Sequence, residues 1–225
     1  MGHKIKIAPS LLSADFTHLA DDIKKCEEGR ADILHADIMD GHFVPNITIG
    51  PSFVEAIKRV TKIPISCHLM IENPEKYIAD FAKAGADMIS AHVEGQTHLH
   101  RTLDLIHSFG IKAGAVLNPA TPLEFAFEAA GYSDFILLMS VNPGFGGQKF
   151  IPSFLKRAGR LKNYLINNNL VHVEIEVDGG VKIDNVKEIV KAGANILVSG
   201  SGIFSGNVVA NIRELRKRAE EVNGN

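Results

Sequence analysis

The stretch NPEKYIADFAKAGADMISAHV, residues 73–93, decides the fold that we expect for this chain. The amphipathic pattern over 74–84 predicts a helix, Gly85 ends it, and the apolar run over 88–93 predicts a strand. Asn73 before Pro74 predicts a capping side chain at the helix start. Because this strand is apolar on both faces, it is typical of a strand buried in a parallel sheet.

The same helix-to-strand joint recurs along the chain. Ala-Gly-Ala followed by Asp or Asn occurs at 84–87 and again at 192–195. Thr121 before Pro122 predicts another capped helix start. Strands are predicted at 5–9, 33–38, 65–70, 88–93, 112–117, 135–140, 173–177 and 196–199. Helices are predicted at 19–28, 53–60, 74–84, 99–109, 123–130, 154–167, 186–192 and 208–221.

This alternation predicts an α/β fold, a closed (β/α)8 TIM barrel. The alternative is a doubly wound open sheet, which usually has about five or six strands and a glycine-rich turn after the first strand. Here the first strand leads into Ala8-Pro9-Ser10-Leu11-Leu12, which contains no glycine. Since no linker or low-complexity tract interrupts the pattern, we expect one domain over residues 1–225.

Composition and charge exclude several classes of protein. The formal net charge is −2 and the charged residues are interspersed, which favours neither nucleic acid nor a membrane surface as partner. We find neither an apolar run of roughly 18 residues nor a signal peptide, so a cytoplasmic protein is expected. Cys26 and Cys67 are expected to be buried free thiols. The polar tail over 216–225 is expected to fray.

Polar side chains occur at the ends of three predicted strands, where barrel enzymes carry their chemistry. His35 and Asp37 are two residues apart and therefore project from one face of a strand. His68 lies at the end of the third strand and Asp178 directly after the seventh. Burying such groups unpaired is costly, so a structural explanation of all four is poor. Two imidazoles and two carboxylates suit a divalent metal such as zinc, iron(II), manganese or cobalt.

Other polar residues of the same region have structural explanations. His92 is expected to be a core histidine with satisfied hydrogen bonds, and Asp40 is expected to be a helix cap. His98, His100 and His107 lie on a predicted helix and are expected at the surface. We therefore leave these residues out of the predicted site.

Glycine-rich loops follow the last three predicted strands. They contain residues 142–147 (NPGFGG), Gly179-Gly180 and Gly200-Ser201. Glycine lets backbone N–H groups approach an anion, and the N-terminus of a short helix after the last strand attracts one. Because barrels bind phosphate with the loops after strands seven and eight, we predict a phosphate site made mainly of backbone donors.

At these residues the sequence closely resembles the ribulose-phosphate 3-epimerase family, from about residue 7 to residue 215. The shared motifs are residues 8–16 (APSLLSADF), 35–51 (HADIMDGHFVPNITIGP), 68–71 (HLMI), 117–122 (LNPATP), 139–150 (MSVNPGFGGQKF), 176–180 (EVDGG) and 200–201 (GS). Two positions depart from the pattern, because Gly202 and Ser199 stand where alanine is expected or common. Gly202 is expected to loosen the short helix by about 1 kcal/mol.

The resemblance implies an isomerase of carbohydrate metabolism, in the pentose phosphate pathway, that interconverts D-ribulose 5-phosphate and D-xylulose 5-phosphate. It implies that His35, Asp37, His68 and Asp178 bind one divalent cation, zinc or iron(II) before manganese or cobalt, and that the protein forms a homo-oligomer. Asp37 and Asp178 are implied to be the acid–base pair. The implied substrate contacts are Ser10, His68, Met39, Met70, Met139, Gly144, Phe145, Gly146, Gly147, Asp178, Gly179, Gly180, Gly200 and Ser201.

Epimerisation next to a carbonyl requires two acid–base groups, since a proton leaves one face of the carbon and another arrives on the opposite face. Asp37 and Asp178, on strands two and seven of an eight-strand ring, are expected to flank the substrate. A metal is expected to stabilise the resulting enediolate as a Lewis acid. The three methionines named above provide a polarizable, apolar wall, and the loop over 141–150 is expected to close as a lid.

Three other functions are consistent with parts of the sequence. The first is epimerisation of a six-carbon ketose phosphate such as allulose 6-phosphate, which would differ in pocket length. The second is a decarboxylase-like barrel, but its Asp-x-Lys-x-x-Asp array has no lysine counterpart at His35-Ala36-Asp37. The third is a sugar-phosphate-binding module without catalysis, which would not need two carboxylates beside two histidines.

Overall fold

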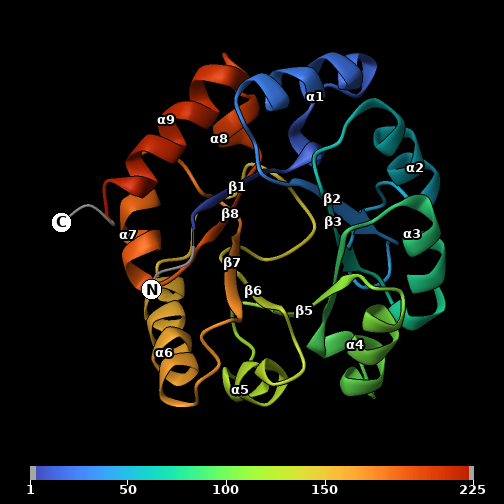
Figure 1. Cartoon of the computed structure of the whole chain (residues 1–225), viewed down its shortest axis with the longest axis vertical. Helices are drawn as coiled ribbons and strands as arrows, with labels where there is room; N and C mark the ends of the chain where they lie inside the picture. The colour runs from blue at the N-terminus through green and yellow to red at the C-terminus, as the bar shows by residue number, and fades with distance from the viewer. Residues whose placement is uncertain (1–3, 223–225) are drawn as a thin grey trace.

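The computed structural model describes residues 4–222, and these form an eight-stranded parallel sheet closed into a barrel and surrounded by helices (Figure 1). The strands pair in the order β1-β8-β7-β6-β5-β4-β3-β2. Their bounds are β1 (Lys6–Pro9), β2 (Leu34–Met39), β3 (Ile65–Met70), β4 (Met88–His92), β5 (Lys112–Leu117), β6 (Phe135–Met139), β7 (Glu174–Asp178) and β8 (Ile196–Ser199). The predicted (β/α)8 barrel is thereby confirmed and the open sheet is excluded.

The helices alternate with the strands along the chain. Their bounds are α1 (Leu19–Glu28), α2 (Pro51–Val60), α3 (Ile78–Ala84), α4 (Leu99–Ser108), α5 (Glu124–Ala130), α6 (Ser153–Asn167), α7 (Val186–Ala192), α8 (Ser201–Phe204) and α9 (Val208–Glu220). Except at the start of α3, these bounds and those of the strands agree with the predicted ones to within a residue or two. The short α8 directly follows β8, at the position where many barrels have an extra helix.

Both predicted helix caps before proline are wrong. Asn73 adopts a left-handed conformation with φ 48°, and Pro74–Lys76 forms a 3-10 turn ahead of α3. Asparagine tolerates this conformation, so it reverses the chain here and does not cap a helix. Thr121 lies before the first turn of α5, and its hydroxyl donates to Glu94. In both places the proline begins a turn ahead of the helix, and the preceding side chain does not cap that helix.

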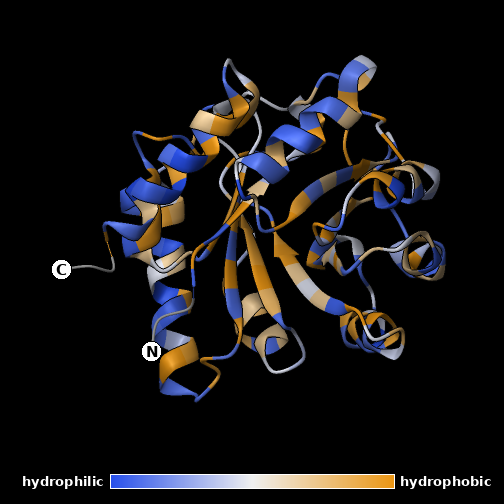
Figure 2. Ribbon diagram, turned by 45° about the horizontal axis from the view of Figure 1, so that its top comes forward, coloured by the Kyte–Doolittle hydropathy of each residue, from blue (hydrophilic) through white to orange (hydrophobic). Residues whose placement is uncertain are grey.

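Two apolar layers stabilise the barrel. The larger layer lies between the sheet and the helices, where strand residues such as Ile65 and Ile89 pack with helix residues such as Phe81 and Ile106. Figure 2 shows apolar residues along the strands and helices of mixed character, as expected for helices with one buried face. A smaller layer inside the barrel consists of Ala8, Ile33, Met88, Phe135, Ile196 and Val198. It fills the barrel near the strand starts and thereby closes the barrel below the cluster of polar groups at the carboxyl ends.

The barrel closes between β1 and β2 without a regular ladder among the residues described. An isolated parallel bridge joins Ser10 to His35. The backbone N–H and carbonyl of Ile7 point toward the segment that leads into β2. The N–H donates to Asp32 Oδ2, and the carbonyl accepts the N–H of Asp32. Pro9 is two residues further along β1 and so presents its nitrogen to the same side. Since proline has no N–H, it occupies the side of β1 where no ladder bond forms.

Three smaller expectations have mixed outcomes. Cys26 and Cys67 are both buried and free, as predicted. The expected fraying from residue 216 is wrong over the part of the tail that is described, because α9 continues to Glu220 and Arg216 Nη2 donates to Asp32 Oδ2 at 2.6 Å. Residues 223–225 of that tail lie outside the described residues. No helix within residues 4–222 is long and apolar enough to span a membrane.

Candidate active site

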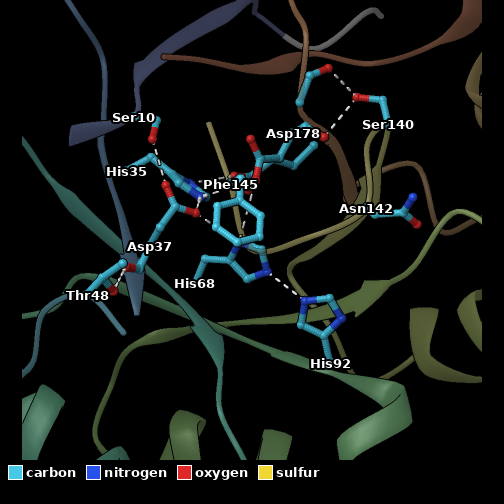
Figure 3. A network of polar contacts seen from close by, with 12 residues as sticks. Ser10, His35, Asp37, Thr48, His68, His92, Ser140, Asn142, Phe145 and Asp178 are labelled. Atoms are coloured by element: carbon cyan, nitrogen blue, oxygen red, sulfur yellow. Dashed lines mark hydrogen bonds and ion pairs between the residues drawn. The ribbon is translucent and has the colours of Figure 1, made fainter. Parts of the chain in front are cut away.

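Two histidines and two aspartates form a buried cluster at the carboxyl ends of β2, β3 and β7 (Figure 3). One nitrogen or carboxylate oxygen from each of His35, Asp37, His68 and Asp178 lies within 4.8 Å of the others. The register explains this grouping, because Asp37 pairs with His68 across β2 and β3 and all of these side chains point into the barrel. The structure therefore brings together the four residues that the sequence predicted as metal ligands.

The two imidazoles turn different nitrogens toward the cluster. His35 Nε2 lies 3.3 Å from Asp37 Oδ1 and 3.9 Å from Asp178 Oδ2. His68 Nδ1 lies 3.3 Å from the same Asp37 oxygen and 3.6 Å from the same Asp178 oxygen. Within residues 4–222 neither of these buried nitrogens has a hydrogen-bond partner. Buried polar atoms normally have partners, so this donor set of two nitrogens and two oxygens fits a divalent cation.

The carboxylates favour positive charge at the centre of the cluster. Burial by itself lowers the pKa of His35, but the negative charge of Asp37 outweighs burial and raises that pKa well above its usual range. In the same way, burial is outweighed at His68 by contacts with Asp178 and Asp37, and its pKa is raised. Burial raises the pKa of Asp37, but the charge of His35 reverses this and holds it well below its usual range. Asp37 is therefore ionised.

Two hydroxyl groups hold Asp37 in place. Ser10 Oγ donates to Asp37 Oδ2 at 2.6 Å. Thr48 Oγ1 donates to the backbone oxygen of Asp37 at 2.6 Å and accepts the N–H of Met39 at 3.0 Å. Ser10 is one of the predicted substrate contacts, whereas Thr48 was not predicted, since nothing in its sequence position indicates that the loop after β2 returns to the strand.

The end of β7 is fixed differently. Ser140 Oγ, at the end of β6, donates to the backbone oxygens of Asp178 and Gly179 at 2.8 and 2.6 Å. Gly179 and Gly180 have φ of 114° and 64°, a region that favours glycine. The Asp178 side chain is 15% exposed and that of Asp37 only 5%. Asp178 is therefore the more accessible of the two carboxylates.

A single cavity connects the cluster to the glycine-rich loops. The residues that line it are Ser10, Leu12, Ser13, Asp37, Met39, Met70, Met139, Val141, Pro143, Gly144, Phe145, Gly146, Gly147, Gln148, Asp178, Gly179, Gly180, Val181, Val198, Gly200 and Ser201. All of the predicted substrate contacts are among them except His68, which is fully buried. The three predicted methionines thus lie on the cavity wall beside the two carboxylates.

The loops after β6 and β8 approach each other at Ser13. A Cβ atom added to Gly200 would lie 2.4 Å from Ser13 Oγ, and one added to Gly146 would lie 3.5 Å from it. The lining residues that the structure describes include no lysine or arginine, so backbone N–H groups and serine hydroxyls are the donors for an anion. Ser13 was not predicted, although it belongs to the motif over 8–16.

The loop after β6 is held at both ends. Asn46, in the loop after β2, donates to the backbone oxygen of Gly144 at 2.7 Å. Gln148 Nε2 donates to the backbone oxygens of Asn142 and Phe145 at 2.6 and 2.8 Å. Phe145 is 55% exposed although it lines the cavity, and Figure 3 draws it in front of the cluster. This position suits the predicted lid, which stays a prediction.

Sequence reasoning missed the residues behind the two histidines. Glu176 Oε1, fully buried on β7, lies 3.2 Å from His35 Nδ1. His92 Nε2 lies 2.9 Å from His68 Nε2, and His92 Nδ1 lies 3.1 Å from Glu94 Oε2. His92 is a buried, hydrogen-bonded histidine as predicted, but its partner is a candidate metal ligand. One signal was available, because His92 and Glu94 have the spacing of His35 and Asp37.

The remaining polar residues have structural roles. Asp40 accepts the N–H groups of His42, Phe43 and Glu72, so it caps a loop and the predicted helix cap is wrong. His98, His100 and His107 are exposed, as predicted.

A parallel (β/α)8 barrel with a His/Asp cluster that could hold a cation, beside glycine-rich loops at the carboxyl ends of its strands, is typical of the phosphate-binding barrel enzymes. Residues 6–204 match the model of the ribulose-phosphate 3-epimerase family. The ribulose-phosphate 3-epimerase of Bacillus subtilis is 53% identical over 200 residues, which are 89% of this chain and 92% of that protein. The Synechocystis enzyme of the same name is 51% identical over 96% of each chain. The chain belongs to the ribulose-phosphate 3-epimerase family.

Solved structures with little sequence similarity share the fold. A 3-hexulose-6-phosphate synthase has a TM-score of 0.69 at 19% identity and covers 96% of this chain and 99% of its own. A thiamine phosphate pyrophosphorylase from Pyrococcus furiosus has a TM-score of 0.67 at 17% identity, with 98% of each chain covered. At this level of identity the likeness establishes the barrel alone.

Proposed function

We propose that the chain interconverts D-ribulose 5-phosphate and D-xylulose 5-phosphate by moving protons at carbon 3. The observation that carries this proposal is the pair Asp37 and Asp178, which reach one cavity from β2 and β7. Epimerisation needs acid–base groups on both faces of one carbon, and this pair provides them. The names and identity of the relatives support the same reaction.

The two carboxylates act as base and acid in turn. In one direction Asp37, whose pKa is held well below its usual range, accepts a proton from one face of carbon 3. Asp178 then acts as the acid and delivers a proton to the other face. The charge left on the substrate in between is delocalised as an enediolate. After one conversion the two aspartates have exchanged protonation states, which prepares them for the reverse reaction.

The cluster is proposed to hold one divalent cation through His35 Nε2, His68 Nδ1, Asp37 and Asp178. Zinc or iron(II) suits this mixed set of nitrogen and oxygen donors, and manganese or cobalt is also compatible with it. A bound divalent cation supplies Lewis-acid stabilisation of the negative charge that develops next to carbon 3. The donor set supports this proposal, because its two imidazole nitrogens are buried without hydrogen bonds among the described residues.

The other end of the substrate is assigned to the glycine-rich loops. Gly146, Gly147 and Gly200 leave backbone N–H groups open to a phosphate, and Ser13 and Ser201 add hydroxyls. Met39, Met70 and Met139 would contact the carbon chain without exchanging protons. The distance between the glycine-rich loops and the His/Asp cluster then determines the length of the sugar phosphate that fits.

Proton NMR in deuterium oxide tests this function directly. Incubation with D-ribulose 5-phosphate should yield D-xylulose 5-phosphate and place deuterium at carbon 3 of both sugars. If carbon 3 retains its hydrogen while the sugar phosphate still binds, the chain is a binding module and the proposal is wrong. Faster turnover of allulose 6-phosphate than of the five-carbon substrate would identify the alternative epimerase.

A further inference from the structure

We propose that His92 and Glu94 are positioning residues that fix the tautomer and orientation of His68, so that His68 presents Nδ1 to the cation. This inference rests on the metal site of the proposed function and adds the residues that contact His68 on the side away from the cation. It assigns a role to two side chains, at the end of β4, that do not line the cavity.

The contacts form one continuous path from the cluster outward (Figure 3 draws its inner part). His68 Nε2 lies 2.9 Å from His92 Nε2, and His92 Nδ1 lies 3.1 Å from Glu94 Oε2. His68 and His92 are 0% and 2% exposed, so no solvent competes for these nitrogens. These two contacts therefore determine which nitrogen of each imidazole ring carries the proton.

The protonation pattern follows from hydrogen-bond chemistry. A cation at Nδ1 requires that His68 carry its proton on Nε2, which must then donate to His92 Nε2. His92 in turn must carry its own proton on Nδ1, and this nitrogen faces the Glu94 carboxylate, which can only accept. When both rings are neutral, each donor on this path meets an acceptor in one arrangement alone, and in that arrangement His68 Nδ1 is free for a cation.

Glu94 is itself held by donors only. Its Oε1 accepts the backbone N–H of Asn118 at 2.8 Å and the hydroxyl of Thr121. Arg157, on α6, donates to the backbone oxygens of Thr121 and Asn118 at 2.6 and 3.3 Å and so holds the same loop. The loop after β5 therefore holds the Glu94 carboxylate in the orientation in which it faces His92.

The two histidines of the proposed metal site have different partners at the nitrogen that faces away from the cluster. His35 has a carboxylate directly behind it, since Glu176 Oε1 lies 3.2 Å from its Nδ1. His68 has an imidazole and then a carboxylate. A ligating histidine normally uses its other nitrogen for a hydrogen bond. His68 Nε2 has such a bond with His92, whereas His35 Nδ1 has only the close approach of the Glu176 carboxylate.

A purely structural role for His92 makes a different prediction. Its ring stacks on His68 with centroids 5.0 Å apart and also contacts Phe43 at 4.6 Å. If packing were its only function, His92→Phe would preserve it. The positioning role requires instead an acceptor toward His68, which phenylalanine lacks and His92→Gln can provide.

The test uses cobalt(II) as the probe, with affinity measured by competition against a chromophoric chelator and the site followed by visible absorption. We expect His92→Phe and Glu94→Gln to weaken cobalt binding by about 10- to 100-fold and to alter the cobalt spectrum. In Glu94→Gln, either orientation of the amide sets one N–H donor against another. His92→Gln should retain more affinity than His92→Phe. His107→Phe, at an exposed position on α4, is the matched control and should leave binding unchanged.

The outcomes separate this inference from the proposed function. Wild-type protein that binds no cobalt contradicts the metal site itself. Wild-type binding together with unchanged affinity in folded His92→Phe and Glu94→Gln overturns the positioning role. Saturating cobalt should restore turnover in the variants, because the reacting groups are intact. Should Glu94→Gln not fold, Thr121→Val removes one donor to Glu94 and must still lower cobalt affinity several-fold.

Discussion

Ser10 Oγ donates to Asp37 Oδ2 at 2.6 Å, while the other oxygen of the same carboxylate lies 3.3 Å from both His35 Nε2 and His68 Nδ1. The two oxygens of Asp37 thus have separate surroundings. Oδ1 faces the two histidine nitrogens that are proposed to bind the cation, and Oδ2 faces Ser10, the residue that bridges β1 to β2. One carboxylate can therefore bind a metal and still keep an oxygen for proton transfer.

Ser10→Ala tests this division. We expect cobalt affinity to stay within a few-fold of wild type, because Oδ1 is unaffected. We expect kcat/KM to fall by about 10- to 100-fold, since a hydrogen bond to a charged group contributes about 1.5–3 kcal/mol. Steady-state kinetics and cobalt competition on the same preparation check both parts. A large loss of cobalt affinity with unchanged kcat would show that Ser10 serves the metal instead.

Asp37→Asn and Asp178→Asn should each abolish most epimerisation while the fold survives. Removing a general acid or base typically lowers the rate by about 10²- to 10⁴-fold. Circular dichroism checks the fold, and cobalt titration of each variant separates lost proton transfer from lost metal. Near-wild-type turnover in either variant, with metal bound, would defeat the two-base mechanism.

Removal of metal should stop turnover and lower the melting temperature together. Dialysis against a chelator, followed by dialysis against metal-free buffer, gives the protein to be measured. A ligand that binds only the folded state at about 100 times its Kd stabilises it by about 2.7 kcal/mol. Zinc, iron(II), manganese and cobalt are then added separately, and the ion that restores both properties at the lowest concentration is the best candidate. Full activity at undetectable metal content would refute the metal requirement.

The two departures from the family pattern, Ser199 and Gly202, are expected to be coupled. A Cβ atom at Gly202 would lie 2.6 Å from Ser199 Oγ and 2.6 Å from Val181 O, and Ser199 Oγ donates to that same oxygen at 2.7 Å. The hydroxyl occupies space that an alanine methyl would need, so Gly202→Ala should destabilise the protein by about 1–3 kcal/mol. The substitution should cost less in a Ser199→Ala background. Equal cost in both backgrounds, measured by urea unfolding, would mean that Val181 alone resists the methyl group.

Glu94 should contribute stability that is lost in acid. Burial raises its pKa, but hydrogen bonds from His92, Thr121 and Asn118 outweigh burial and lower the pKa to about 2 from 4.5. The stabilisation is complete above pH 4.5 and disappears as the pH falls toward 2, because the unfolded chain takes up the proton first. Because Glu94 is partly exposed, solvent screening reduces this contribution. The difference in unfolding free energy between wild type and Glu94→Gln should therefore shrink over this range, and a constant difference would contradict the low pKa.

The barrel and the four candidate ligands could be predicted because they depend on local patterns. His35 and Asp37 share a strand face through a period of two, and Asp178 follows a buried run. Thr121 and Ser13 could not be assigned, since their roles depend on loops that meet only after the barrel closes. The same holds for Ser199, whose hydroxyl donates to Val181 O and occupies the space beside Gly202. Sequence periodicity shows which side a residue faces but does not show what it meets there.

The joint between β1 and β2 has a mechanical consequence. A ring of hydrogen-bonded strands resists widening equally all round, except where a bond is missing. Pro9 removes one such bond beside Ser10, which carries both the backbone bridge to His35 and the hydrogen bond to Asp37. The seam of the wall with the fewest backbone hydrogen bonds thus lies beside the strand that carries Asp37. By contrast β7, which carries Asp178, is paired by ladders on both of its sides.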